Sequence, residues 1–466
     1  MAANNLPKKK DIITDIVTNE LSHVQLLKDR SFWGIAVTQF LGAFNDNVFK
    51  QIILLLSVPV VLAGAAEVAG QIQPLGGGGN DVQGWATAIF SLPFVLLSGL
   101  AGFLSDRYRK RDVIVISKVA EIVVMLFGMI AFLAYGSWGM AGTWTVLFLM
   151  ATQSTFFGPG KYGILPELFQ SKDLPKANGL ILMSTFLAII FGTVVAGILF
   201  DLLLVTDKLG RPSAQPLWIA SCICIFIAMI GTWSSTWIRQ SQPAQPNSKL
   251  TKADWAISPS VKRMLWNDRP LLSALLVSCV FWMISGIAVP VVNSLGITQL
   301  GVNKSKTSLL VGGIAIGIML GAALSAVVFK RLKPRGQVIV GLWGLFVALV
   351  ILGFWKDNGQ HLLGYTGSFV GLIAVGIFAA IYAVPLQVFM QERPPMELKG
   401  RMIGTMNQAN FVGILFSGLL YQLFQWIAKQ LGWPISSVFW MLALMVLPLA
   451  IFYRLGSSHL EGTEST

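Results

Sequence analysis

The stretch Gly102-Phe103-Leu104-Ser105-Asp106-Arg107-Tyr108-Arg109-Lys110-Arg111 joins two long apolar runs, residues 85–104 and 113–134. Each run has the roughly 20 residues that a helix needs to cross a lipid bilayer. The stretch itself carries one acid and four basic residues, and basic residues gather in the cytoplasmic loops of membrane proteins. It therefore predicts two membrane-spanning helices that are joined on the cytoplasmic side.

The composition of the whole chain agrees with this prediction. Of its 466 residues, 55% are hydrophobic and 12% are charged. A soluble domain has about 25% charged residues, so this chain has too few for a surface that faces water. The low charge also argues against a nucleic-acid-binding protein, although the net charge is +13.

Twelve apolar runs are long enough to cross a bilayer. They are residues 32–62, 85–104, 113–134, 143–164, 177–204, 217–237, 270–296, 307–329, 337–355, 366–391, 402–426 and 434–454. The sequence therefore predicts an all-α membrane protein with twelve transmembrane helices.

The distribution of Lys and Arg predicts the orientation of these helices. An even number of spans places both termini on one side of the membrane, and 25 of the 34 Lys and Arg residues then lie on that side. Only six lie on the other side, which identifies the side of the termini as the cytoplasm. We predict a multi-pass membrane protein with both termini in the cytoplasm.

The two halves of the chain resemble each other. Val113–Ile116 has a counterpart at Val338–Gly341, 225 residues later, and at this offset the basic loop 105–112 falls on Lys330–Arg335. Duplicated six-helix halves are typical of secondary transporters. The predicted division is a cytoplasmic amphipathic segment 1–31, an N-terminal half 32–237, a cytoplasmic linker 238–269, a C-terminal half 270–455 and a polar tail 456–466.

The stretch Gly102–Arg111 resembles the loop motif between the second and third spans of the major facilitator superfamily. The motif usually has glycine where Arg109 stands, which puts its tight turn in question. The resemblance implies a major facilitator fold in which this loop controls switching between inward-facing and outward-facing states. It assigns the switch to Gly102, Asp106, Arg107, Arg109, Lys110 and Arg111. Asp106 is expected to lie near the N-terminal end of a neighbouring helix or to pair with arginines.

Two further segments resemble the lysophospholipid transporter family within that superfamily. One is Phe40–Asn47, and the other is Phe157–Leu168 with its continuation Lys176–Leu180. The second motif includes Lys161, Tyr162, Glu167 and Asn178.

The same transporter module occurs fused to acyltransferase domains, none of which is expected here. The resemblance implies a secondary transporter of the bacterial cytoplasmic (inner) membrane that moves lysophospholipids inward by alternating access. Its expected partners are the lysophospholipid substrate, membrane lipids and a separately encoded acyltransferase.

Charged residues inside the spans cost about 2.5–3.5 kcal/mol each, so each should have a partner or a function. Asp46 and Lys50 lie one helical turn apart and could form a structural ion pair. Alternatively, Asp46 faces a polar cavity. The second reading predicts that substrate binds at Asn45, Asp46, Asn47, Lys50, Gln153 and Lys161.

Three other charged residues lie in or near the spans: Lys161 has two alternative interpretations, and Lys118 and Glu121 have a structural one. Lys161 follows Gly158-Pro159-Gly160, which would loosen the helix, so it could gate the cavity or bind the phosphate of a lipid head group. It could equally extend its amine to the membrane surface. Lys118 and Glu121 are interpreted as a structural pair.

We expect no enzyme activity, no cofactor and no metal site. The three cysteines have no metal-ligand spacing, and no histidine stands in the H-x-x-x-x-D pattern of a membrane acyltransferase. The alternative function is a major facilitator exporter of drugs, siderophores or other amphiphiles. The Gly102–Arg111 loop fits both functions, whereas the motifs around Asp46 and Lys161 favour lysophospholipid transport.

Overall fold

The computed structural model describes residues 26–59, 80–169, 173–206, 212–327, 332–395 and 398–455, apart from 245, 248–249, 251–256 and 258. The predicted amphipathic segment before residue 26 and the predicted tail 456–466 lie outside the described residues, and so does the side chain of Tyr162.

Twelve long helices make up most of the described chain. They are α2 (Arg30–Leu56), α3 (Gln83–Arg107), α4 (Lys110–Leu133), α5 (Tyr135–Gly163), α7 (Leu174–Leu203), α8 (Trp218–Ser235), α10 (Arg269–Ser294), α11 (Lys304–Val327), α12 (Pro334–Leu352), α13 (Gly364–Glu392), α14 (Lys399–Gln430) and α15 (Val438–Phe452). The short elements are η1 (Leu26–Lys28), α6 (Leu165–Leu168), η4 (Gln215–Leu217), α9 (Pro259–Asn267), η6 (Leu295–Gln299), η9 (Ile435–Ser437) and the strand pair β1 (Val205–Thr206) and β2 (Pro212–Ser213). The predicted all-α fold class is confirmed.

Ten of the long helices in the described part of the chain are long and apolar enough to cross a membrane. The two outside this group are α2 and α5. The run Asn45–Asn47 and Lys50 lie in α2, and Thr152–Thr155 is a polar run in α5. These two helices therefore carry all six residues that were predicted to bind substrate.

Some element boundaries differ from the prediction. Helix α5 begins eight residues before the predicted span, because a short first turn precedes Gly139, whose φ of 53° bends the chain. Glycine tolerates this conformation at no steric cost. The predicted linker 238–269 contains α9, whose Val261 and Leu265 lie one turn apart and are buried.

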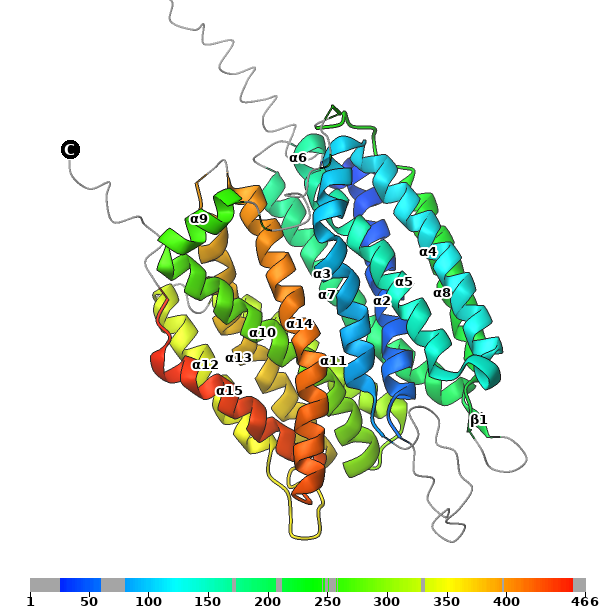
Figure 1. The fold of residues 1–466 in the computed structure, drawn as a ribbon, viewed down its shortest axis with the longest axis vertical. Helices are drawn as coiled ribbons and strands as arrows, with labels where there is room; N and C mark the ends of the chain where they lie inside the picture. The colour runs from blue at the N-terminus through cyan, green and yellow to red at the C-terminus, as the bar shows by residue number, and fades with distance from the viewer. Residues whose placement is uncertain are drawn as a thin grey trace, which may run out of the picture.

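The long helices form two bundles. Helices α2, α3, α4, α5, α7 and α8 pack on one another as the N-terminal bundle, and α10 to α15 pack as the C-terminal bundle. Figure 1 shows the two bundles side by side, the N-terminal one in blue to green and the C-terminal one in green to red. Between them, α3 lies against α14 and α7 lies against α11.

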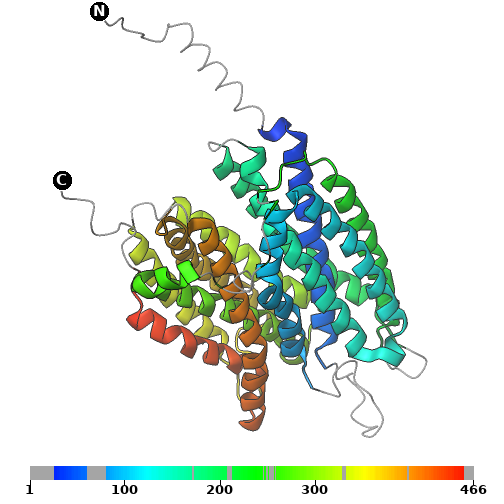
Figure 2. The ribbon, with the colours of Figure 1, turned by 45° about the horizontal axis from the view of Figure 1, so that its top comes forward.

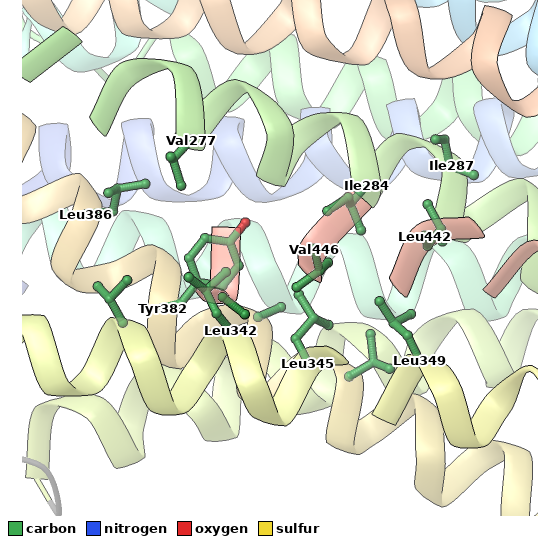
Figure 3. Close-up of a cluster of buried hydrophobic side chains, with 14 of the residues drawn as sticks. Val277, Ile284, Ile287, Leu342, Leu345, Leu349, Tyr382, Leu386, Leu442 and Val446 are labelled. Carbon is green, nitrogen blue, oxygen red and sulfur yellow. The ribbon is translucent and has the colours of Figure 1, made fainter. Parts of the chain in front are cut away.

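The core of the C-terminal bundle consists of aliphatic side chains from several helices. Leu342, Leu345 and Leu349 of α12 lie opposite Leu442 and Val446 of α15 (Figure 3). These side chains are almost completely buried. They hold α12 and α15 in a fixed position within the bundle.

Helices α11 and α13 approach each other through glycines. A Cβ added at Gly317 would clash with the carbonyl oxygen of Ile373, and one at Gly376 would clash with that of Ile314. Small residues that bring backbones together are a main source of helix association in lipid. The two helices therefore pack too closely for larger residues at these positions.

The bundles contact each other unevenly along their length. We call the end of the molecule at which α2 begins the terminal end, and the end at which α2 stops the distal end (top and bottom of Figure 2). At the distal end, a Cβ on either Gly84 of α3 or Gly418 of α14 would clash with the other's carbonyl oxygen. Among the described residues, every hydrogen bond between the bundles lies at the distal end or midway along the helices.

Candidate functional site

Asp46 lies midway along α2 and has one engaged and one free carboxylate oxygen. Ser154 of α5 donates a hydrogen bond of 2.6 Å to Asp46 Oδ2, and Gln153 Nε2 donates to Ser154 Oγ at 2.8 Å. Asp46 Oδ1 is buried and has no hydrogen-bond partner in the structure. A buried acceptor without a donor is costly, so this oxygen is suited to receive a donor from a ligand.

Lys50 does not neutralise Asp46. No ion pair within 4.0 Å joins these two described residues, although they lie one turn apart. Instead, Lys50 Nζ lies 4.5 Å from the ring centroid of Phe90 on α3. An ammonium group over an aromatic face is stabilised by the ring quadrupole. The ion-pair alternative is therefore wrong for this conformation.

Lys161 lies near the aromatic ring of Phe157, one turn earlier on α5. Its Nζ is 5.7 Å from the ring centroid, and Lys118 Nζ of α4 is 6.0 Å from the same centroid. Phe157 is therefore placed between two cationic side chains. The geometry combines an aromatic wall with positive charge.

A second carboxylate, Glu121 of α4, is fully engaged. Asn45 Nδ2 donates to Glu121 Oε1 at 2.8 Å, and Lys118 forms an ion pair with Glu121 Oε2. The side chains of Lys118 and Glu121 are each 1% exposed. Gly231 of α8 makes room for them, since a Cβ there would lie 2.9 Å from Lys118 Cε. Asn45, which was predicted to bind substrate, instead fastens α2 to α4.

Two other predicted asparagines bind only to their own helices. Asn47 Nδ2 donates to the carbonyl oxygen of Ala43 at 2.7 Å, and Asn178 Nδ2 donates to that of Leu174 at 3.0 Å. Asn178 is exposed. These hydrogen bonds do not bring either side chain to Asp46.

The loop between α3 and α4 is bonded to the motif Phe157–Leu168, which resembles the lysophospholipid transporter family. Lys110 forms an ion pair with Glu167 of α6. Arg111 donates to the carbonyl oxygen of Thr236 at 3.0 Å, and Arg109 reaches the side chain of Gln240 at 3.5 Å. The contacts bring together the predicted switch and the motif that contains Lys161. We call this set of contacts the loop junction.

The turn of this loop does not need a glycine. Tyr108 has φ −105° and ψ 167°, and Arg109 has φ −62° and ψ 121°. Both are extended conformations that any residue can adopt. The replacement of the usual glycine by Arg109 therefore introduces no backbone strain.

Asp106 and Arg107 behave differently from the expectation. Asp106 is exposed and forms no ion pair with a described residue. Arg107 lies near the rings of Phe103 and Tyr108, at 5.9 Å and 5.8 Å from their centroids. The predicted pairing of Asp106 with arginines is wrong for this conformation, because Arg107 is held by aromatic side chains. A side chain at Gly102 would meet open space.

A polar network joins the two bundles at the distal end. Gln51 Nε2 donates to Asn293 Oδ1, and Asn293 Nδ2 donates to Gln83 Oε1, each at 2.8 Å. Gln83 and Tyr421 both donate to Asp81, the latter at 2.8 Å. We call this network the distal latch; it comprises Gln51, Asp81, Gln83, Asn293, Ser294 and Tyr421.

A second distal contact joins α7 to α11. Asp201 accepts hydrogen bonds from the backbone nitrogens of Lys304 and Ser305 at 3.0 Å and 2.7 Å. A carboxylate at a helix N-terminus satisfies free N–H groups and the helix dipole. Asp201 of one bundle thus caps a helix of the other.

Midway between the ends, α3 and α14 meet through aromatic rings. Phe94 and Phe411 stack with centroids 3.9 Å apart and an interplanar angle of 2°. Gln408 Nε2 donates to the carbonyl oxygen of Val95 at 3.2 Å. The contacts between the bundles therefore extend from the distal end to about the middle of the molecule.

The sequence did not identify the distal latch. Gln83, Asn293 and Tyr421 are single polar residues at the ends of separate apolar runs. Their partners in the other bundle lie more than a hundred residues away. The only signal was the concentration of polar residues at the distal ends of several spans.

Comparisons with known proteins agree with this geometry. The family model of the Major Facilitator Superfamily matches residues 35–418. Relatives named lysophospholipid transporter LplT, from Yersinia pestis (strain Pestoides F) and Yersinia pseudotuberculosis serotype O:3 (strain YPIII), are each 26% identical over 428 residues. These alignments cover 88% of this chain and 90% of each relative.

Solved transporters share the fold. A POT family transporter in complex with 5-aminolevulinic acid has a TM-score of 0.68 at 12% identity, over 91% of this chain and 95% of that one. The xylose transporter XylE from E. coli, in an inward open conformation, has a TM-score of 0.61 at 14% identity, over 90% and 95%. At these identities the likeness concerns the fold alone.

Proposed function

The chain belongs to the Major Facilitator Superfamily, and we propose that it moves lysophospholipids inward across the bacterial cytoplasmic membrane by alternating access. The observation that carries this proposal is the half-buried Asp46 carboxylate, whose buried Oδ1 has no hydrogen-bond partner among the described residues. The names of the relatives from Yersinia support the substrate class.

The side chains around Asp46 suit such a substrate. A lysophospholipid has a charged head group and a single acyl chain. Asp46 Oδ1 can accept a hydrogen bond from an amine or hydroxyl of the head group. Phe90 and Phe157, each beside a lysine, supply apolar walls together with positive charge for a phosphate.

The hydrogen bonds between the bundles at the distal end support a state that is closed on the outer side, and inward transport. Since 25 of the 34 basic residues lie on the side of the termini, we propose that the terminal end faces the cytoplasm. The distal latch then closes the outer side. Import requires that the latch opens to admit lipid and closes again before release on the cytoplasmic side.

The loop junction is the proposed counterpart at the cytoplasmic end. It links α4, α6 and the end of α8 within the N-terminal bundle through Lys110, Arg109 and Arg111. We propose that these contacts change when the cytoplasmic ends of the two bundles approach each other. A separately encoded acyltransferase would restore the second acyl chain of the imported lipid.

The test is uptake of radiolabelled lysophosphatidylethanolamine into proteoliposomes that contain the purified protein. We expect saturable uptake above that of protein-free liposomes, reduced by unlabelled lysophospholipids and unaffected by cationic drugs. Uptake no greater than in protein-free liposomes would overturn the proposal. Competition by drugs as strong as that by lysophospholipids would favour a general amphiphile carrier.

A further inference from the structure

A cavity opens at the distal end, and two residues of the distal latch, Asp81 and Ser294, contribute to its wall. Its volume is about 740 Å³, and it lies between the start of α3, the end of α14 and the segment before α15. Among the described residues that line it, Asp81 and Lys429 are the two that carry charge. The cavity is therefore a place where one negative and one positive group face the same space.

Three tryptophans contribute to the wall of this cavity. Trp85, Trp426 and Trp433 line it and are 48%, 60% and 41% exposed. Indole rings attract ammonium groups more strongly than other aromatic side chains do, and a wall of several aromatic rings is typical of sites for organic ammonium ligands. The wall thus favours a cation with apolar substituents over a small inorganic ion.

Asp81 is held in place by neighbouring side chains. Tyr421 Oη donates to its Oδ2 at 2.8 Å, and the hydroxyl of Ser294 donates to the same oxygen. Gln83 N donates to its Oδ1 at 3.0 Å. Gln422 Nε2 donates to the Asp81 carbonyl oxygen at 3.1 Å. The carboxylate is therefore oriented before a ligand arrives, which lowers the entropic cost of binding.

We propose that this cavity is an outer binding site for the amine-bearing zwitterionic head group of the substrate. The ammonium group binds at Asp81 between the tryptophans, and the phosphate lies toward Lys429. That the ligand carries an acyl chain rests on the proposed function. The head-group chemistry rests on the cavity alone, so a phospho-amine without an acyl chain should also bind.

The test is equilibrium dialysis of radiolabelled glycerophosphoethanolamine against the purified protein in nanodiscs. We expect saturable binding, and binding of glycerophosphoglycerol, which has no amine, at least about tenfold weaker, because an amine bound to a carboxylate is worth more than about 1.4 kcal/mol. Equal binding of the two compounds would overturn the proposal.

Variants place the binding in this cavity. Asp81→Asn should weaken binding about tenfold, as expected for the loss of one charge-assisted bond. Since Asp81 also belongs to the distal latch, Trp426→Ala and Lys429→Glu provide independent tests outside the latch. Each should weaken binding severalfold, by the magnitude of one cation–π contact or one ion pair.

The matched control is Trp138→Leu. Trp138 lies on α5, is 54% exposed and does not line the cavity, so binding should be unchanged. Wild-type binding by both Trp426→Ala and Lys429→Glu would overturn the site. If head-group binding is present but lysophospholipid uptake is absent, the proposed function fails and the outer site stands. The reverse result would reject the site alone.

Discussion

Glu121 and Asp46 are carboxylates of the same bundle with opposite surroundings. Glu121 has a partner on each oxygen, Asn45 and Lys118, and is 1% exposed. Asp46 has a single partner, Ser154, and a second oxygen without one. The bonds on both oxygens suit Glu121 to a structural role, whereas the free oxygen of Asp46 is available to exchange partners during transport.

The largest expected effect comes from breaking the paired carboxylate. Lys118→Ala leaves Glu121 as a buried charge without its counterion, which costs about 3–5 kcal/mol. We expect a large decrease in the unfolding temperature in detergent, measured by intrinsic fluorescence, and little protein in the membrane. The double variant Lys118→Met with Glu121→Gln removes both charges and should recover most of this loss. A single variant as stable as wild type would contradict the structural assignment.

The partly free carboxylate should show the reverse behaviour. Asp46→Ala removes the proposed acceptor for the head group, so lysophospholipid uptake should fall at least about tenfold, equivalent to 1.4 kcal/mol of lost interaction. Its unfolding temperature should equal or exceed that of wild type, because a buried acceptor without a partner is removed. Asp357→Ala, in the exposed loop before α13, is the control and should transport normally. Normal uptake by the Asp46 variant would remove it from the substrate site.

The loop junction tests whether another paired carboxylate is structural or mobile. Lys110 is 6% exposed and Glu167 is 25% exposed, so their ion pair lies between the two extremes. We expect Lys110→Met to lower uptake a fewfold, with a change in stability within about 1 kcal/mol. Glu167→Gln should have the same effect on uptake. If the loss of uptake in the double variant equalled the sum of the losses in the two single variants, Lys110 and Glu167 would not act as a unit.

The smallest effect is expected at His361, a buried titratable group outside the membrane spans. It lies in the loop before α13, 4% exposed, with Nε2 at 2.9 Å from the Leu352 carbonyl oxygen. Burial lowers the pKa of His361. The folded state therefore favours the neutral imidazole. The buried neutral side chain contributes to the free energy of unfolding above the ordinary histidine pKa of about 6.5, and this contribution is lost as the pH falls through that value.

The measurement is the unfolding temperature at pH 7.5 and 5.5 for wild type and His361→Gln. The decrease at the lower pH should be slightly greater for wild type, since the glutamine does not titrate. Identical decreases would show that His361 does not contribute to the pH dependence.

The helices could be predicted from the sequence because each long apolar run has a local hydropathy signal. The functional residues could be predicted only in part. Asp46 stood out as a charge within a span, but its choice of Ser154 over Lys50 depends on how α5 and α3 pack against α2. Tertiary packing also decides that Asn45 turns toward Glu121.

The contacts between the bundles could not be predicted. Gln83 and Asn293 are 210 positions apart, and neither differs in character from other amides at the ends of spans. Their meeting depends on the relative position of two halves in one conformational state. One sequence is compatible with every conformational state of a transporter, so it does not identify the contacts that form in a single state.

The spacing of Lys118 and Glu121 also has a consequence for biosynthesis. The two residues are three positions apart on α4, so they can pair as soon as that helix forms, before α8 is synthesised. A nascent segment that neutralises its own charges enters the bilayer at a lower cost than one that must wait for a distant counterion. Moving the lysine to another helix would preserve the final pair, and we expect it to lower the efficiency with which the membrane-insertion machinery integrates α4.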